Sequence, residues 1–153
     1  MRVLQAGRSP HAFRMEDLPI QQVTQPLGRC PDTRQLALAA ARAADENRGR
    51  DIVVLDVREL TPVFDYFVIA TGSSRRQLHA MSDDIDRVLR KEFNYERLGV
   101  EGYEGSRWIL LDYGNVVVHL LDPEAREYYA LEQLWCRGQR VPFEPAETAA
   151  ATS

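Results

Sequence analysis

The chain has 153 residues, of which 44% are hydrophobic, enough for one globular domain with a core and short tails. No apolar run approaches the roughly 20 residues of a membrane-spanning helix, and two cysteines are too few for a disulfide framework or a thiol metal site, which favours a reducing compartment. The net charge is −4 and the first 31 residues carry +2, so the remaining −6 domain lacks the basic stripe typical of nucleic-acid binding.

The two ends of the chain differ in composition from its middle. Residues 1–31 mix Pro, Gln, Arg and Gly without a period and predict a flexible extension. Its arginines resemble a mitochondrial presequence, but Glu16, Asp17 and the prolines disfavour that interpretation. We therefore expect the bacterial cytoplasm rather than an organelle. Residues 144–153 are small and polar and predict a disordered tail, which leaves residues 32–143 as the folded domain.

The first half of that domain predicts two helices and two inner strands. Asp32 is a candidate N-cap of a helix that ends around residues 47–49. The apolar, β-branched runs 52–57 and 66–71 predict buried strands. Ser74 can cap the next helix, whose apolar positions recur with helical spacing and include Leu78, Met81 and Ile85.

The second half predicts a hairpin between a short strand and a last helix. The short strand lies near residues 97–101, and a glycine-bearing loop joins it to a hairpin over residues 108–121. Pro123 suits the first turn of a helix that places Tyr128, Leu131 and Trp135 on one side. The order α-β-β-α-β-β-β-α predicts an α/β fold of the α+β type, with a five-stranded mixed sheet flanked by helices.

The hairpin has two unequal faces. A two-residue Gly114-Asn115 loop pairs Tyr113 with Val116, and this register places Asp112 opposite Val117 and Leu110 opposite His119. One face is wholly apolar and predicts contact with helices. The other face is too apolar for solvent and too polar for an ordinary core, and it carries Trp108, Leu110, Asp112, Val117, His119 and Leu121.

Asp112 and His119 are diagonal neighbours on this second face. As a catalytic pair they would be a carboxylate and the base that it orients, but no Ser, Cys or Thr of this face can serve as nucleophile. A histidine that is simply satisfied by a local carboxylate is the plainer interpretation. A third is a surface that binds a partner, with Trp108 as its anchor.

The turn Gly72-Ser73-Ser74 is the other candidate site. It lies at a strand-to-helix junction followed by Arg75 and Arg76, where free N–H groups can bind phosphate. It matches neither the Walker pattern nor GxGxxG, and a capped helix start is the plainer interpretation. No strand downstream carries paired carboxylates, and the three histidines are too scattered for zinc, so the sequence predicts no metal and no cofactor.

Five segments together resemble the ribosomal silencing factor RsfS (Iojap) family. They cover roughly residues 32–135 in that family's order and spacing. The segments are Asp65-Tyr66-Phe67-Val68-Ile69, Thr71-Gly72-Ser73-Ser74-Arg75, Trp108 to Gly114, Val117-Val118-His119 and Tyr128 to Trp135.

The resemblance implies a fold like that of nucleotidyltransferases, without their catalytic carboxylates and without enzymatic activity. It also implies a homodimer when free, and binding to the large ribosomal subunit through its ribosomal protein number fourteen. Bound there, such a protein blocks subunit joining and represses translation when nutrients are short. The family's contact surface matches Glu101, Trp108, Asp112 and His119, with Tyr113 and Leu110 as further candidates.

The sequence departs from the family at one position of the hairpin turn. The family usually has aspartate after the hairpin glycine, where this chain has Asn115. The turn should form with either residue, but affinity for the ribosome could fall.

Two rival functions remain open. The first rival is a nucleotidyltransferase-like enzyme that uses the Gly72-Ser73-Ser74 turn. The second is a structural dimerisation module, which predicts that Trp108 is buried between protomers.

Overall fold

The computed structural model describes residues 32–105 and 107–144. The expected N-terminal extension and all but the first residue of the expected C-terminal tail lie outside the described residues. The elements in chain order are α1 Thr33–Glu46, β1 Arg50–Asp56, β2 Tyr66–Thr71, α2 Arg75–Phe93, β3 Gly99–Glu101, β4 Trp108–Asp112, β5 Val116–Leu121, α3 Pro123–Tyr129, α4 Leu131–Leu134 and β6 Gln139–Arg140.

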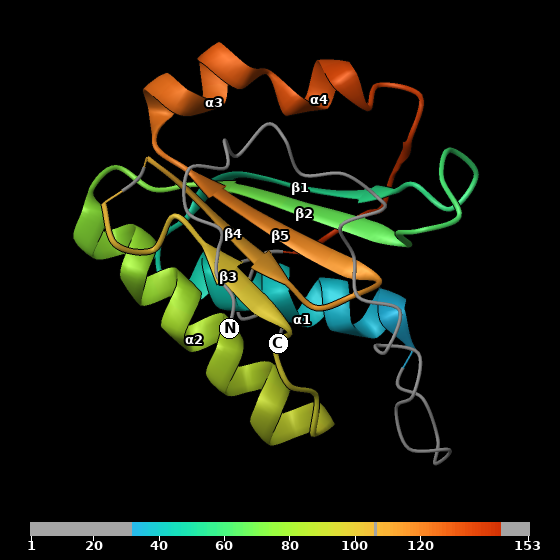
Figure 1. Cartoon of the computed structure of the whole chain (residues 1–153), viewed down its shortest axis with the longest axis horizontal. Helices are drawn as coiled ribbons and strands as arrows, with labels where there is room; N and C mark the ends of the chain where they lie inside the picture. The colour runs from blue at the N-terminus through green and yellow to red at the C-terminus, as the bar shows by residue number, and fades with distance from the viewer. Residues whose placement is uncertain (1–31, 106, 145–153) are drawn as a thin grey trace. The chain divides into compact units, whose positions relative to one another are not determined.

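The strands form one mixed sheet in the order β3-β4-β5-β2-β1-β6 (Figure 1). β2 and β5 run parallel at its centre, and the other neighbours are antiparallel. The predicted mixed sheet with flanking helices is confirmed, but it has six strands instead of five. The additional strand, β6, consists of two exposed residues, Gln139 and Arg140, which carry no alternating pattern that a sequence could reveal.

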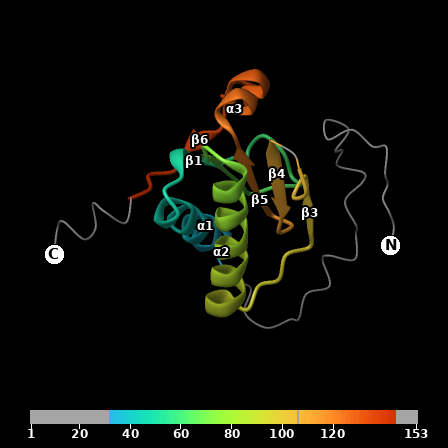
Figure 2. The same ribbon diagram turned by 90° about the vertical axis from the view of Figure 1, so that its left-hand side faces the viewer.

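The two long helices cover one face of the sheet. Figure 2 shows α1 and α2 together on one side of the strands, with α3 apart from them. The alanines of α1 allow it to lie close to α2 and to the sheet, since six of its seven buried residues are alanine. The wholly apolar hairpin face belongs to this core as expected, through Ile109, Leu111, Tyr113, Val116, Val118 and Leu120.

Side-chain caps begin three of the helices, and those at Asp32 and Ser74 are at the predicted residues. Asp32 accepts a hydrogen bond from the Arg34 N–H, Ser74 accepts one from Gln77 and Asp122 accepts one from Ala125. Each cap satisfies a backbone donor that the first helical turn leaves without an internal partner.

The last helical segment differs from its prediction. It is interrupted at Ala130, whose φ of 45° and ψ of 52° end α3 and start α4. A left-handed backbone is uncommon for alanine because its Cβ crowds the carbonyl oxygen, so the residue type gives no signal for the break. As a result Tyr128 and Trp135 do not share one continuous helical face, and Tyr128 is 80% exposed.

Two serines of α2 should respond to substitution in opposite directions. The Ser82 hydroxyl is fully buried and has no hydrogen-bond partner among the described residues. Ser82→Ala should therefore raise the free energy of unfolding by about 1 kcal/mol, because it removes an unsatisfied polar group. Ser74→Ala should lower it by about 1 kcal/mol through loss of the cap. Urea denaturation measures both changes, and destabilisation by Ser82→Ala would show that the hydroxyl has a partner.

A candidate binding face on the hairpin

The candidate site is the second face of the β4–β5 hairpin together with Glu101 of β3. The observed register pairs Trp108 with Leu121, Leu110 with His119 and Asp112 with Val117, as predicted. Glu101 pairs with Leu110 and so lies on the same face of the sheet. We call Glu101, Trp108, Leu110, Asp112, Val117, His119 and Leu121 the hairpin face.

The Gly114-Asn115 turn that sets this register forms with asparagine after the glycine. Gly114 takes the positive φ of 90° that the turn requires, and the Tyr113 N–H donates to the Val116 carbonyl. The Asn115 carbonyl accepts hydrogen bonds from the N–H groups of Asp65 and Tyr66, at 2.7 and 3.2 Å. The turn is thereby attached to the start of β2 through its backbone, which does not depend on the side chain at residue 115.

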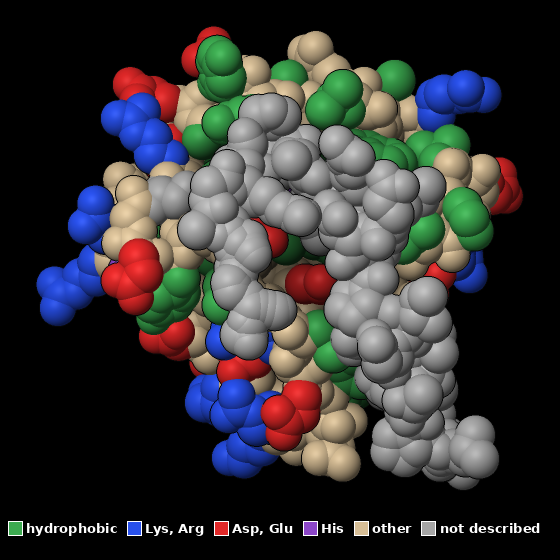
Figure 3. All heavy atoms as spheres, viewed as in Figure 1, with side chains coloured by type: hydrophobic (Ala, Val, Ile, Leu, Met, Phe, Trp, Pro, Cys, Tyr) green, Lys and Arg blue, Asp and Glu red, His purple; other side chains and the backbone are tan. Residues whose placement is uncertain are grey.

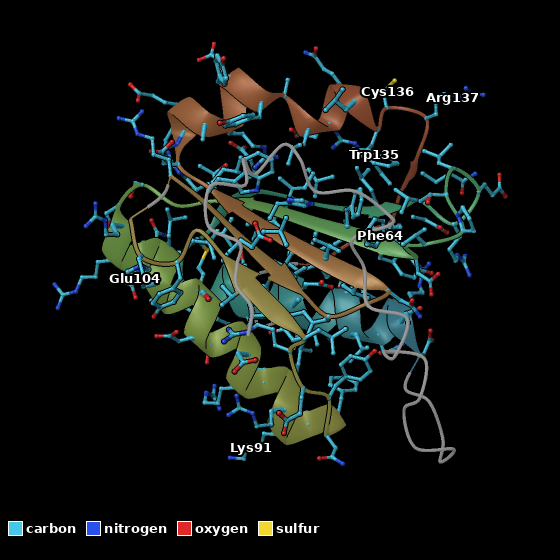
Figure 4. The ribbon with its side chains drawn as sticks, viewed as in Figure 1. Phe64, Lys91, Glu104, Trp135, Cys136 and Arg137 are labelled. Carbon is cyan, nitrogen blue, oxygen red and sulfur yellow. The ribbon has the colours of Figure 1, made fainter. Side chains whose placement is uncertain are left out.

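A continuous series of aromatic rings crosses this face from α3 to the end of α4. Trp108 lies near its middle, with ring centroids 4.5 Å from Tyr129 and 5.8 Å from His119. His119 contacts Phe67 edge-on at 5.3 Å, and Phe67 contacts Trp135 at 4.8 Å. Such edge-on and tilted ring pairs are favourable beyond the area they bury. Figure 4 shows Trp135 pointing toward the sheet, whereas Cys136 and Arg137 point away from it.

His119 is held neutral within this series. Its Nδ1 accepts a hydrogen bond of 3.2 Å from the Trp108 indole N–H, which requires an imidazole nitrogen without a proton. Burial lowers the pKa of His119 to about 3, because the charged ring would lose its water. The ring therefore acts as a fixed acceptor that orients the indole.

Asp112 does not form a hydrogen bond with His119, so the expected pairing of this histidine with a local carboxylate is wrong. Its carboxylate instead accepts a hydrogen bond of 2.8 Å from the Gly114 N–H and so supports the hairpin turn. Burial raises the pKa of Asp112 above its usual range, the Gly114 hydrogen bond opposes this, and the charge of Glu101 raises it further. The negative charges of Asp112 and of the exposed Glu101 therefore repel each other across this face.

The six predicted site residues differ in exposure. Glu101 is exposed, and Trp108 and Asp112 are half-buried. Leu110 and His119 are buried on the same face, at 9% and 7% exposure. Tyr113 is fully buried on the opposite face, and its hydroxyl donates to Asp86 at 3.3 Å. Only Glu101, Trp108 and Asp112 of the six therefore present substantial surface to solvent.

Tyr129 is a member of this site that the sequence pattern did not single out. It is 39% exposed, and together with Tyr128 and Leu134 it forms an apolar surface along α3 and α4. Figure 3 shows hydrophobic side chains along this edge of the molecule. The helical spacing of Tyr128, Leu131 and Trp135 suggested one buried side, and only the break at Ala130 turns these residues apart.

The Gly72-Ser73-Ser74 turn uses its polar groups internally. The Gln77 side chain accepts from the Ser73 N–H at 2.6 Å and from the Ser73 hydroxyl at 3.0 Å, while Ser74 caps Gln77. A Cβ at Gly72 would lie 2.8 Å from the Met81 side chain and 2.9 Å from that of Leu78. Close helix packing thus accounts for the glycine, and the capped helix start accounts for the serines.

Two further features concern the described residues only. Within residues 32–105 and 107–144, no group of three or more His, Cys, Asp or Glu side chains is placed to hold a metal ion. None of the helices in the same ranges combines the length and the hydrophobicity of a membrane crossing.

Comparison with known proteins finds that this chain is similar to ribosomal silencing factors. The profile of the family described as "Ribosomal silencing factor during starvation", RsfS, matches residues 31–153. Ribosomal silencing factor RsfS of Chromobacterium violaceum is 38% identical over 112 residues, which cover 73% of this chain and 90% of that protein. Mitochondrial assembly of ribosomal large subunit protein 1 of Mus musculus is 38% identical over 92 residues, which cover 59% of this chain and 40% of that protein. A crystal structure of a Chromobacterium violaceum protein has a TM-score of 0.66 at 36% identity, over 76% of this chain and 98% of that one.

The buried His119 should make stability fall on acidification. The unfolded chain takes up a proton on this ring below about pH 6.5, whereas the folded chain does so only near pH 3. The stabilisation is therefore complete above about pH 6.5 and is lost as the pH falls toward 3. Relative to His119→Phe, the wild-type chain should lose about 1 to 2 kcal/mol of unfolding free energy between about pH 7.5 and about pH 5. If the unfolding free energies of the two proteins change equally with pH, the His119 ring is not neutral and buried.

Proposed function

The chain belongs to the RsfS family of ribosomal silencing factors, and on that premise we propose that it binds the large ribosomal subunit and represses translation. The contact we propose is with ribosomal protein number fourteen, at the surface where the small subunit joins. One relative, from Mus musculus, is named for the assembly of the ribosomal large subunit. The proposed action is steric: the protein occupies a surface that the small subunit needs, and it has no substrate to turn over.

The observation that carries this proposal is the composition of the hairpin face. A half-buried indole shares this face with one exposed and one half-buried carboxylate, Glu101 and Asp112. Interfaces commonly combine an aromatic anchor of this kind with charged groups near its rim. Two carboxylates whose charges repel each other would gain most from a partner's arginine or lysine. A basic protein surface is therefore the chemistry that fits this face.

The predicted residues would have different roles in such a complex. Trp108 would supply the apolar anchor, and Glu101 and Asp112 would pair with basic side chains. His119 would act through Trp108 by fixing the direction of its indole, since the ring itself is buried. Tyr113 and Leu110 would hold the hairpin in shape, Tyr113 through its hydrogen bond to Asp86 on α2.

The enzymatic alternative receives no comparable support. The serines and the Ser73 N–H of the Gly72-Ser73-Ser74 turn already have partners within the chain. The relatives named above carry the names of ribosomal factors, which agrees with a regulator that binds. Absence of catalysis and of a cofactor, a homodimer in the free state and a cytoplasmic location remain predictions.

Trp108→Ala tests the proposed anchor. It should weaken binding to purified large subunits by about 2 kcal/mol or more, roughly 30-fold, because truncation removes the central aromatic contact. Co-sedimentation over a range of subunit concentrations measures the affinity. Lys91→Ala, at an exposed position of α2 on the helical side of the sheet, is the matched control and should bind normally. Normal co-sedimentation of the Trp108 variant would show that the docking site lies elsewhere.

Asp112→Asn separates binding from folding. The amide oxygen can still accept from the Gly114 N–H, while the partly buried charge that Glu101 repels is removed. The unfolding free energy at neutral pH should therefore stay the same or rise. Affinity for the large subunit should fall at least about tenfold if the carboxylate pairs with a basic side chain. A variant that is less stable but binds as wild type would reverse both expectations and assign Asp112 to structure alone.

A further inference from the structure

Arg126 connects four parts of the fold through one side chain. Its Nε and Nη2 donate to the two carboxylate oxygens of Glu132, at 3.0 and 2.7 Å. Nη1 donates to the Thr71 hydroxyl at the end of β2, and Nη2 also donates to the Asp51 carbonyl of β1, both at 2.7 Å. The side chain is only 11% exposed. The planar guanidinium can make these contacts together because its donors form a rigid fork, which lysine lacks.

The helices that Arg126 connects cannot hold their own position. α3 and α4 contain seven and four residues, far fewer than an isolated helix needs for stability in water. They meet at Ala130, which adopts an unfavourable left-handed backbone. Arg126 belongs to α3 and Glu132 to α4, so their ion pair spans this break. The bonds to Thr71 and Asp51 then attach both helices to the sheet.

Two rings of the aromatic series depend on that placement. Tyr129, the last residue of α3, lies 4.5 Å from the Trp108 ring, and Trp135, which ends α4, lies 4.8 Å from the Phe67 ring. His119 and Tyr129 therefore contact the indole from different elements: His119 belongs to the central sheet, whereas Tyr129 is held by helices that Arg126 attaches.

We propose that Arg126 is a positioning residue for partner binding: by fixing α3 and α4 it places Tyr129 against the Trp108 indole and so pre-forms the hairpin face. The inference rests on the proposed docking function of that face. We expect Arg126 to act without contacting the partner, since four of its five N–H donors are occupied within the chain and its side chain is nearly buried. A pre-formed anchor avoids the cost of ordering the helices when the complex forms.

The direct test compares arginine substitutions in the full-length chain. Arg126→Met should weaken binding to purified large subunits about tenfold or more, measured by co-sedimentation at a temperature where circular dichroism shows the variant folded. Arg126→Lys should recover only part of the loss, because one ammonium group cannot bridge Glu132, Thr71 and Asp51 together. The matched control is Arg87→Met, which removes an exposed arginine paired with Asp84 on α2 and should change affinity less than about twofold.

A double-mutant cycle distinguishes positioning from general destabilisation. If Arg126 acts through Tyr129, then Arg126→Met should cost much less affinity in a Tyr129→Ala background than in the wild-type chain. If Arg126 only stabilises the fold, the two losses should multiply. The proposal is overturned by multiplying losses, or by wild-type affinity of folded Arg126→Met.

Two further outcomes keep the proposal falsifiable. If Arg126→Met does not fold, Glu132→Gln removes the charge and one of the two acceptor oxygens that Arg126 uses, and Thr71→Val removes the hydroxyl acceptor. Unchanged affinity of both variants would overturn the proposal. Trp108→Ala, run in parallel, separates this inference from the proposed function. Weak binding by Trp108→Ala with normal binding by Arg126→Met rejects the positioning role alone. Normal binding by Trp108→Ala rejects the docking face itself, and with it the role of Arg126.

Discussion

Parallel pairing of β2 with β5 at the centre of the sheet is the constraint on which the rest of this structure depends. Every residue of both strands is buried, so each face of the sheet must be covered. α1 and α2 cover one face with close-packed alanine and leucine side chains. On the other face, aromatic rings from β2, β4, α3 and the end of α4 pack against one another. The candidate docking face is therefore continuous with a core rather than a patch added to the surface.

Burial acts in opposite directions on the two ionisable groups of that face. It lowers the pKa of His119 and raises the pKa of Asp112, because in each case the charged form loses water. For His119 the result is a neutral ring whose acceptor nitrogen holds the Trp108 indole. For Asp112 the result is a partly buried carboxylate near Glu101, whose ionised form lowers the stability of the fold. Groups that weaken the fold in this way are often retained for binding.

The chain also shows how a strand-to-helix turn can look like an anion site and serve the fold alone. Gln77 accepts from Ser73 and donates to the carbonyls of Asn47 and Arg48, so it connects the turn to the end of α1. Gly72 lies against Leu78 and Met81, whose side chains would have to move to admit a Cβ. These contacts explain the residue types without a ligand.

The sequence by itself determined most of the elements and the two faces of the hairpin, although it revealed neither β6 nor the break between α3 and α4. The caps at Asp32 and Ser74, the inner strands and the Gly114 turn all follow from local rules, because period, capping and turn geometry act within a few residues. The family was also readable, because several motifs occur in register. Tertiary structure alone decided which neighbour each side chain meets. Asp112 contacts Gly114 instead of His119, Ala130 breaks the last helix, and Arg126 reaches Thr71 across 55 positions of sequence. The contact of Arg126 with Thr71 joins residues distant along the chain, so no local pattern encodes it.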